Sequence, residues 1–273
     1  YWGCIIGRYG NRIANGKFSI EGVEYTLPQN NATNCLHGGL RGFSHHVWDA
    51  EMPNKQTIVL KYTSVDGEEG FPGNLCIEMT YTLTDNNEIR IDYKATTDKP
   101  TLCNLTNHSF FNLKGEGNGN ILDHEMQIHS RYMTTINDQI LTDGKFSGVK
   151  NTPFDFREKH TIGERINAED EQLANGHGYD HNWIIDKSTP NEYVWAATVS
   201  DPKSGRELQV WTDQVGLQFY SGNFFDGKCN GKWGQPLNKR EGFALETQYF
   251  PDAINHPTLA PMPILNPGEE YHQ

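Results

Sequence analysis

The sequence lacks several features that would by themselves define a class of protein. No apolar run in its 273 residues approaches the roughly 20 residues that a membrane-spanning helix needs, so no spanning helix is predicted. Basic residues are scarce, because 23 Lys and Arg face 35 Asp and Glu and give a formal net charge of -12. That charge repels phosphate backbones and anionic lipids, which argues against nucleic-acid and membrane partners and suits a neutral ligand such as a sugar.

Cysteines are few, and none lies close to another. The five are odd in number and include no C-x-x-C motif: Cys4, Cys35, Cys76, Cys103 and Cys229. This pattern favours free, mostly buried thiols in a reducing compartment over a disulfide framework or a metal site. It predicts a cytoplasmic location, while the start at Tyr1 rather than Met leaves a periplasmic location and an upstream signal segment open.

Sequence typical of helices is also sparse. The glycines within residues 1–16 rule out a stable helix there, and their spacing does not match a phosphate-binding loop. One short helix is predicted over residues 161–174, where Thr161 and Glu164 fit a capping box. No repeat of fixed period and no linker divides the chain, so a single domain over 1–273 is expected.

Strand patterns and aromatic residues are plentiful instead. The chain has 13 Phe, 12 Tyr and 6 Trp with which to build a core. Residues 18–27 alternate as a hairpin around Glu21-Gly22, and residues 47–97 alternate as a β-meander with turn residues at 85–87. These patterns favour an all-β protein with few short helices.

The segment 104–113, Asn-Leu-Thr-Asn-His-Ser-Phe-Phe-Asn-Leu, is predicted to be a strand of mixed character. Asparagine is disfavoured inside strands unless its amide has a specific partner. His108, between Asn107 and Ser109, is a candidate proton donor because the ordinary pKa of histidine lies near neutrality. The alternative is a structural histidine that backbone groups satisfy.

Other residues with possible chemical roles lie far from this segment. His37 precedes Gly38-Gly39, whose flexibility lets the backbone approach a ligand closely. Arg12 either holds a ligand oxygen or pairs with a surface carboxylate. Asp180 enters an apolar strand, where an acid is usually paired or functional.

Glu246 lies inside the apolar and aromatic run 242–250, with no Lys or Arg nearer than Arg240. Burial disfavours the charged carboxylate, so the pKa of Glu246 is predicted to rise toward a value that suits a general base. The alternative is a carboxylate that backbone donors satisfy.

Seven motifs in this order resemble the aldose 1-epimerase (galactose mutarotase) family nearly end to end. They are GRYGNRI (7–13), LHGGLRGF (36–43), DGEEGFPG (66–73), TNHSFFNL (106–113), GYDHNW (178–183), GLQFY (216–220) and LETQYFPDA (245–253). The resemblance implies an all-β fold, a large antiparallel β-sandwich of the galactose mutarotase-like supersandwich type, with few short helices. It also implies that this chain lacks the family's N-terminal segment and last C-terminal strand.

The resemblance further implies that the chain interconverts the α and β anomers of free aldohexoses, such as galactose and glucose. Glu246 matches the general base that deprotonates the C1 hydroxyl, and His108 matches the general acid that protonates the ring oxygen. The substrate-binding positions that match are His37, Arg12, Asn11, Asp180 and Gln218. No metal or cofactor is implied. The implied partner is a small sugar, with the chain as a monomer or homodimer.

Three alternatives remain open on the sequence alone. Glu246 and Asp180 are a carboxylate pair of the kind that a glycoside hydrolase or lyase uses. A sugar-binding module without turnover would keep the same residues. An epimerase acting on phosphorylated sugars is disfavoured because no extra arginine cluster surrounds the motifs.

Overall fold

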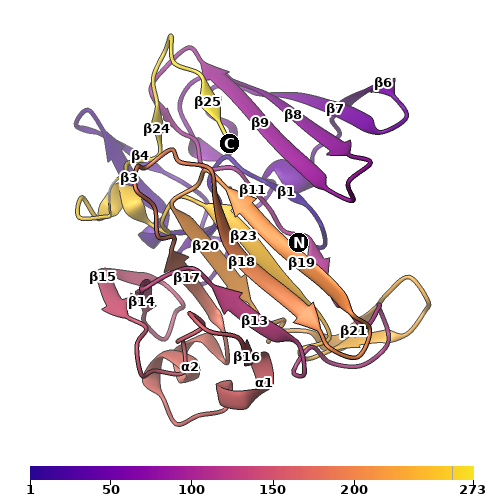
Figure 1. The fold of residues 1–273 in the computed structure, drawn as a ribbon. Coiled ribbons are helices and arrows are strands. Elements are labelled where there is room, and N and C mark those ends of the chain that lie inside the picture. Colours follow the sequence, from indigo (N-terminus) through magenta and orange to yellow (C-terminus); the bar gives the residue numbers. More distant parts are fainter. Residues whose placement is uncertain (260) are drawn as a thin grey trace. The chain divides into compact units, whose positions relative to one another are not determined.

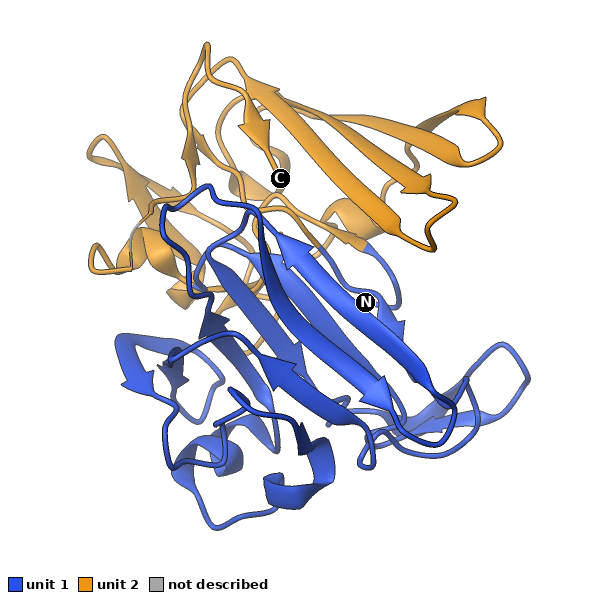
Figure 2. Ribbon diagram, viewed as in Figure 1, with its two compact units in different colours: residues 1–4, 107–251 blue, residues 5–106, 252–273 orange. Residues whose placement is uncertain are grey.

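The structure is a computed structural model that describes residues 1–259 and 261–273. The chain divides into two compact units (Figures 1 and 2). Unit 1 contains residues 1–4 and 107–251, and unit 2 contains residues 5–106 and 252–273. Antiparallel strands dominate both units, which confirms the prediction of an all-β fold with few short helices. Among the described residues, no helix is long and apolar enough to cross a membrane.

Unit 1 contains two sheets and a separate hairpin. The six-stranded sheet has the order β12 (Phe110–Phe111), β23 (Phe243–Gln248), β20 (Gly216–Tyr220), β17 (Asp180–Ile184), β14 (Tyr132–Ile136) and β15 (Thr142–Gly148). The four-stranded sheet has the order β16 (His160–Thr161), β13 (Glu125–Ile128), β18 (Val194–Asp201) and β19 (Arg206–Thr212). The hairpin pairs β21 (Asp226–Asn230) with β22 (Pro236–Asn238).

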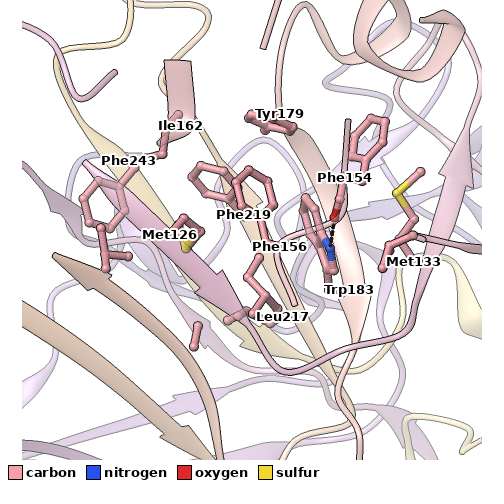
Figure 3. Close-up of a cluster of buried hydrophobic side chains, with 14 of the residues drawn as sticks. Met126, Met133, Phe154, Phe156, Ile162, Tyr179, Trp183, Leu217, Phe219 and Phe243 are labelled. Atoms are coloured by element: carbon pink, nitrogen blue, oxygen red, sulfur yellow. Dashed lines mark hydrogen bonds between the residues drawn. The ribbon is translucent and has the colours of Figure 1, made fainter. Parts of the chain in front are cut away.

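Alternate side chains of both sheets form the core of unit 1. Trp183, Phe219 and Phe243 come from the six-stranded sheet, and Met126 comes from the four-stranded sheet (Figure 3). The indole N–H of Trp183 donates to the backbone oxygen of Phe154 at 3.2 Å, so the one polar atom of that ring is satisfied. Each fully buried side chain of this size stabilises the unit by about 1.5–3 kcal/mol.

The helix predicted over residues 161–174 is wrong in its extent and its cap. Two separate helices occur, α1 (Ile162–Arg165) and α2 (Glu171–Gly176). The Thr161 side chain makes no capping hydrogen bond, and the Glu164 carboxylate contacts Nδ1 of His160 at 3.0 Å instead of completing the box. Asp170 caps α2 by accepting from two backbone N–H groups of its first turn.

The strand predicted over residues 104–113 is also interrupted. Only β11 (Thr106–Asn107) and β12 (Phe110–Phe111) are strands, and His108-Ser109 lies between them. The side-chain oxygen of Asn107 accepts from the backbone N–H of Ser109 at 3.1 Å. This local turn competes with the ladder hydrogen bonds and breaks the strand at His108.

Unit 2 contains the predicted meander and hairpin, and both predictions are confirmed. The five-stranded sheet has the order β25 (Tyr271–His272), β9 (Ile89–Thr97), β8 (Leu75–Leu83), β7 (Thr57–Ser64) and β6 (Asp49–Asn54). The hairpin pairs β3 (Lys17–Ile20) with β4 (Val23–Thr26) through Glu21 and Gly22, which both have positive φ.

Short elements complete unit 2. β2 (Arg12–Ile13) pairs with β5 (Cys35–Leu36), and β10 (Thr101–Leu102) pairs with β24 (Ile264–Leu265). The remaining short strand and the 3-10 turns are β1 (Ile5–Ile6), η1 (Ala14–Gly16), η2 (Phe43–His45), η3 (Glu68–Gly70) and η4 (Ala253–Asn255). Its core gathers buried side chains from the hairpin and the loops, among them Tyr9, Phe18 and Phe71.

Candidate active site

One face of the six-stranded sheet in unit 1 is polar and yet buried. In β17, β20 and β23 the apolar core takes alternate side chains such as Trp183, Phe219 and Phe243, and the residues between them point to the opposite face. On that face Asn182, Gln218 and Glu246 lie directly opposite one another in the sheet register. Their side chains are almost wholly buried. Buried polar groups need partners or serve chemistry, so this face marks the candidate site of unit 1.

Glu246 lies in the middle of β23, as a buried acid within an apolar run. Its chain neighbours Leu245 and Thr247 face the other side of the sheet, where Leu245 packs against the core. The sequence-based expectation of a buried carboxylate is therefore confirmed. Burial favours the neutral carboxyl over the carboxylate, which is the environment that a general base near neutrality requires.

His108 is an ionisable partner of Glu246 within unit 1. Its Nε2 lies 3.5 Å from Oε1 of Glu246, and the two side chains are 8% and 3% exposed. The backbone holds the histidine in place, because its N–H donates to the oxygen of Cys4 and its oxygen accepts from the N–H of Gly3. Phe110 packs against the ring, with the ring centroids 4.9 Å apart.

Burial changes the protonation of His108 from that of an ordinary histidine, whose pKa lies near neutrality. Burial lowers the pKa of His108 to about 4. A charged Glu246 at 3.5 Å acts in the opposite direction, because it stabilises the imidazolium. Near pH 7 the imidazole is therefore neutral. Whether it binds a second proton depends on the charge of Glu246 beside it.

Asp180 and Gln218 meet on the same face of the sheet. The side-chain nitrogen of Gln218 donates to Oδ1 of Asp180 at 2.7 Å. Asp180 is 9% exposed and is the first residue of β17, so its carboxylate is an acceptor near the end of the strand. Of the two alternatives for Asp180, a paired or a functional acid, this hydrogen bond shows the first, and the second stays a prediction. The NH₂ group of Gln218 is therefore already engaged in a hydrogen bond to Asp180.

In unit 2, the matched residues Asn11 and His37 are in contact although 26 positions separate them. The backbone N–H of Asn11 donates to Nδ1 of His37 at 3.1 Å, and the N–H of His37 donates to the oxygen of Asn11 at 3.0 Å. Because Nδ1 accepts a hydrogen bond, a neutral His37 carries its proton on Nε2 and is a donor there. Both residues are buried.

The backbone around His37 is unusual. Asn11 and His37 have φ values of 65° and 52°, a region that non-glycine residues rarely adopt and that often accompanies functional sites. Gly38 follows with φ 84°, and a Cβ there would clash with the backbone oxygen of Gly7. Only glycine therefore fits at position 38, directly after the histidine.

Arg12 is buried rather than placed on the surface. It pairs with Leu36 between β2 and β5, and its Nε donates to the side-chain oxygen of Asn31 at 3.0 Å. Its own backbone N–H donates to the side-chain oxygen of Asn11 at 2.9 Å. These contacts therefore do not support the alternative in which Arg12 pairs with a surface carboxylate.

Two residues of the polar face were missed from the sequence, Asn182 and Gln248. They lie two positions after Asp180 and Glu246 in the same strands and therefore point the same way. The side-chain nitrogen of Gln248 donates to Oδ1 of Asn182 at 3.2 Å and to Oε1 of Gln218 at 3.4 Å. The period of two, applied from each predicted acid, would have found both.

Comparison with known proteins supports the resemblance to the aldose 1-epimerase family along the whole chain. The family model described as aldose 1-epimerase matches residues 1–273. The galactose mutarotase of Rattus norvegicus is 42% identical over 272 residues, which are 100% of this chain and 77% of that protein. The aldose 1-epimerase of Escherichia coli K12 is 38% identical over 273 residues, covering 99% of this chain and 78% of that protein.

The fold agrees as well. A crystal structure of an aldose epimerase homologue from C. elegans superposes with a TM-score of 0.88 at 28% sequence identity. The match covers 98% of this chain and 79% of that one, so the fold is galactose mutarotase-like. A full-length family match and relatives above a third identical leave one assignment. The chain belongs to the aldose 1-epimerase family and is an isomerase of that family.

Proposed function

We propose that this isomerase interconverts the α and β anomers of free aldohexoses, with Glu246 as general base and His108 as general acid. The observation that carries the proposal is the buried pair itself, in which Nε2 of His108 lies 3.5 Å from Oε1 of Glu246. The reacting hemiacetal has two oxygens on one carbon, the C1 hydroxyl and the ring oxygen. A base and an acid held this close together can each reach one of them.

The proposed reaction moves two protons and forms no bond to the protein. Glu246 takes the proton of the C1 hydroxyl while His108 gives a proton to the ring oxygen, so the bond between C1 and that oxygen breaks. The open aldehyde turns about the C1–C2 bond. Closure on the other face returns a proton to His108 and takes one from Glu246, which gives the other anomer. Each positioned proton transfer typically contributes about 10²–10⁴-fold.

The lowered pKa of His108 fits this cycle in a specific way. The pair must hold one proton between its members at the start and at the end of each turnover. A pKa of about 4 makes the imidazolium a readier donor to the ring oxygen than an ordinary histidine. The charged carboxylate beside it supplies the opposing stabilisation, so productive sugar binding is expected to be accompanied by proton uptake from solvent.

The sugar-binding roles of the other residues are proposed from the matching motifs and from their burial. In unit 1, Asp180 is an acceptor for a sugar hydroxyl, with Gln218 beside it. In unit 2, Arg12, Asn11 and His37 are buried polar residues joined by hydrogen bonds. A sugar with several hydroxyls requires several such donors and acceptors.

Galactose is a proposed substrate because the mammalian relatives are named for it, and glucose is proposed because the resemblance implies free aldohexoses in general. The five cysteines are free thiols, which supports a cytoplasmic location in a reducing compartment. We propose a monomer or homodimer of one catalytic domain over 1–273 that acts on a small sugar without nucleic-acid or membrane partners.

The experiment that tests the proposal is polarimetry on freshly dissolved α-D-galactose and α-D-glucose, with and without the protein. The expected result is faster approach to the same final rotation, and the ratio of the two rates gives the sugar preference. Circular dichroism of the same sample shows whether it is folded. A folded sample that binds sugar without accelerating the change would overturn the proposal, and release of glucose from a disaccharide would favour hydrolysis.

A further inference from the structure

A chain of buried amides lies behind Asp180 on the polar face of the sheet. Gln248 is 0% exposed and Asn182 is 1% exposed. Gln248 donates to the side-chain oxygens of Asn182 and Gln218, and Gln218 donates to Asp180. Three strands, β17, β20 and β23, therefore contribute to one hydrogen-bonded chain that ends on a carboxylate.

The direction of this chain follows from the chemistry of its last member. An ionised carboxylate can only accept hydrogen bonds, so Gln218 must turn its NH₂ group toward Asp180. The carbonyl of Gln218 then points toward Gln248, which must present its own NH₂ group. The second contact of that NH₂ group, to the oxygen of Asn182 at 3.2 Å, is consistent with the same orientation.

Burial makes the orientation of each amide consequential. In a water-poor interior a reversed amide places two acceptors or two donors face to face, with no solvent to satisfy them. The backbone also leaves room for the hydrogen-bonded amides, because a Cβ at Gly216 would meet Oδ1 of Asn182 at 2.5 Å. Glycine at this position leaves room for the Asn182 amide beside Gln248.

We propose that Gln248 and Asn182 are positioning residues that hold the Gln218 amide toward Asp180 and so keep Asp180 ready to accept a sugar hydroxyl. The inference rests on the proposed function, because it presumes that Asp180 binds the sugar. Gln248 and Asn182 need not touch the substrate. Their effect is expected on sugar binding, whereas the His108–Glu246 pair governs the chemical step.

The first test compares the steady-state kinetics of Gln248→Leu with those of the unmodified protein. The expected result is a KM raised about 10-fold with kcat within about 3-fold, because binding is weakened in ground and transition state alike. A matched control is Gln209→Leu, an exposed glutamine on β19 of the same unit, which should change neither constant. A Gln248→Leu variant that lowers kcat at constant KM would overturn the inference.

The variant Gln248→Glu tests the donor-to-acceptor direction of the hydrogen bonds that run from Gln248 through Gln218 to Asp180. A charged glutamate cannot donate, so it would attract the NH₂ group of Gln218 and turn its carbonyl toward Asp180. KM should then be raised more than in Gln248→Leu at pH 8. It should fall toward the Leu value at pH 5, where the protonated acid can donate. A KM that does not depend on pH in this variant, beyond the dependence in the unmodified protein, would contradict the proposed direction.

A double-mutant cycle separates this inference from the proposed function. If Gln248 acts through Asp180, then Gln248→Leu should leave KM unchanged in an Asp180→Ala background. Additive effects would show that Gln248 acts by another route and would overturn the inference alone. If Asp180→Ala by itself leaves KM unchanged in a folded protein, the proposed sugar-binding role of Asp180 fails instead. Thermal unfolding of each variant shows whether it folds. If Gln248→Leu does not fold, Gln248→Asn replaces it.

Discussion

Two sheets of this protein each carry a row of polar side chains at register positions, and the rows differ in burial. In the five-stranded sheet of unit 2, Asp49, Lys61, Glu78 and Lys94 lie opposite one another across four strands and alternate in charge. In the six-stranded sheet of unit 1, the corresponding row is Asn182, Gln218 and Glu246. The first row is partly or fully exposed to solvent, and the second is almost wholly removed from it.

The difference in burial shows which of the two polar rows requires a functional explanation. Lys61 contacts Glu51 at 3.8 Å and Glu78 at 3.6 Å, and all three side chains are 43–72% exposed. Exposed pairs of this kind contribute about 0–1 kcal/mol each and are a common way to make a sheet face water-compatible. A buried carboxylate in a row of amides costs free energy to desolvate, so its presence indicates a role beyond stability.

The largest expected effect comes from removing the charge of the buried row. Glu246→Gln keeps the size of the side chain but removes the base, so kcat should fall by about 10²–10⁴-fold with little change in sugar affinity. Polarimetry gives the rate, and titration calorimetry with galactose gives the affinity. The matched control is Glu78→Gln in the exposed row, where no change in kcat is expected. Near-normal turnover in folded Glu246→Gln would remove Glu246 from its proposed role.

The second effect concerns the partner of Glu246. His108→Asn removes the proton donor and should lower kcat by about 10²–10⁴-fold at pH 7 while galactose still binds. The pH profile distinguishes a proton donor from a residue that only supports the structure. If His108 donates the proton, the change of rate with pH that reflects titration of the His108–Glu246 pair should disappear in His108→Asn. An unchanged profile at a uniformly lowered rate would argue for a merely structural histidine.

The sequence allowed the strands that carry Asp180 and Glu246 to be predicted, because alternation is a local property and both acids lie in apolar runs. The break at His108 could not be predicted, since it depends on Asn107 bonding the N–H of Ser109 rather than the ladder. The contact between Asn11 and His37 joins loops far apart in the chain, and no periodicity encodes it.

The protonation of His108 was likewise beyond the sequence. Its pKa of about 4 arises mainly from burial, which only the folded arrangement determines. The roles of the matched residues came from the resemblance, and physical patterns alone identified only some of them as candidates. Asn182 and Gln248 show the opposite case, because a period-2 count from two predicted acids would have placed both on the same face.

An intermediate effect tests burial on the apolar side of the same sheet. Burial lowers the pKa of His181 to about 3, below the value near 6.5 expected in the unfolded chain. Between these pH values the unfolded chain binds more protons, so stability is complete above about pH 6.5 and is lost as the pH falls toward 3. The free energy of unfolding should therefore drop by roughly 1–3 kcal/mol between pH 7 and pH 4 on account of His181.

Urea unfolding at several pH values measures this loss, and His181→Gln should flatten it. His108, with its lowered pKa, contributes in the same direction. The exposed His45 provides the control, because His45→Gln should leave the dependence on pH unchanged. If the unmodified protein and His181→Gln lose stability equally on acidification, burial of His181 is not a cause of acid sensitivity.

The smallest expected effect lies in the exposed row. Lys61→Met removes the cation that faces Glu51 and Glu78 but keeps an apolar stem on β7. Because these charges stay in contact with water, the free energy of unfolding should change by less than about 1 kcal/mol, and the difference should shrink in 1 M salt. Urea unfolding at low and high salt measures the change, and polarimetry should give an unchanged kcat. A loss of several kcal/mol or a loss of activity would mean that exposure does not separate the two rows, and the inference from burial to function at Glu246 would lose its basis.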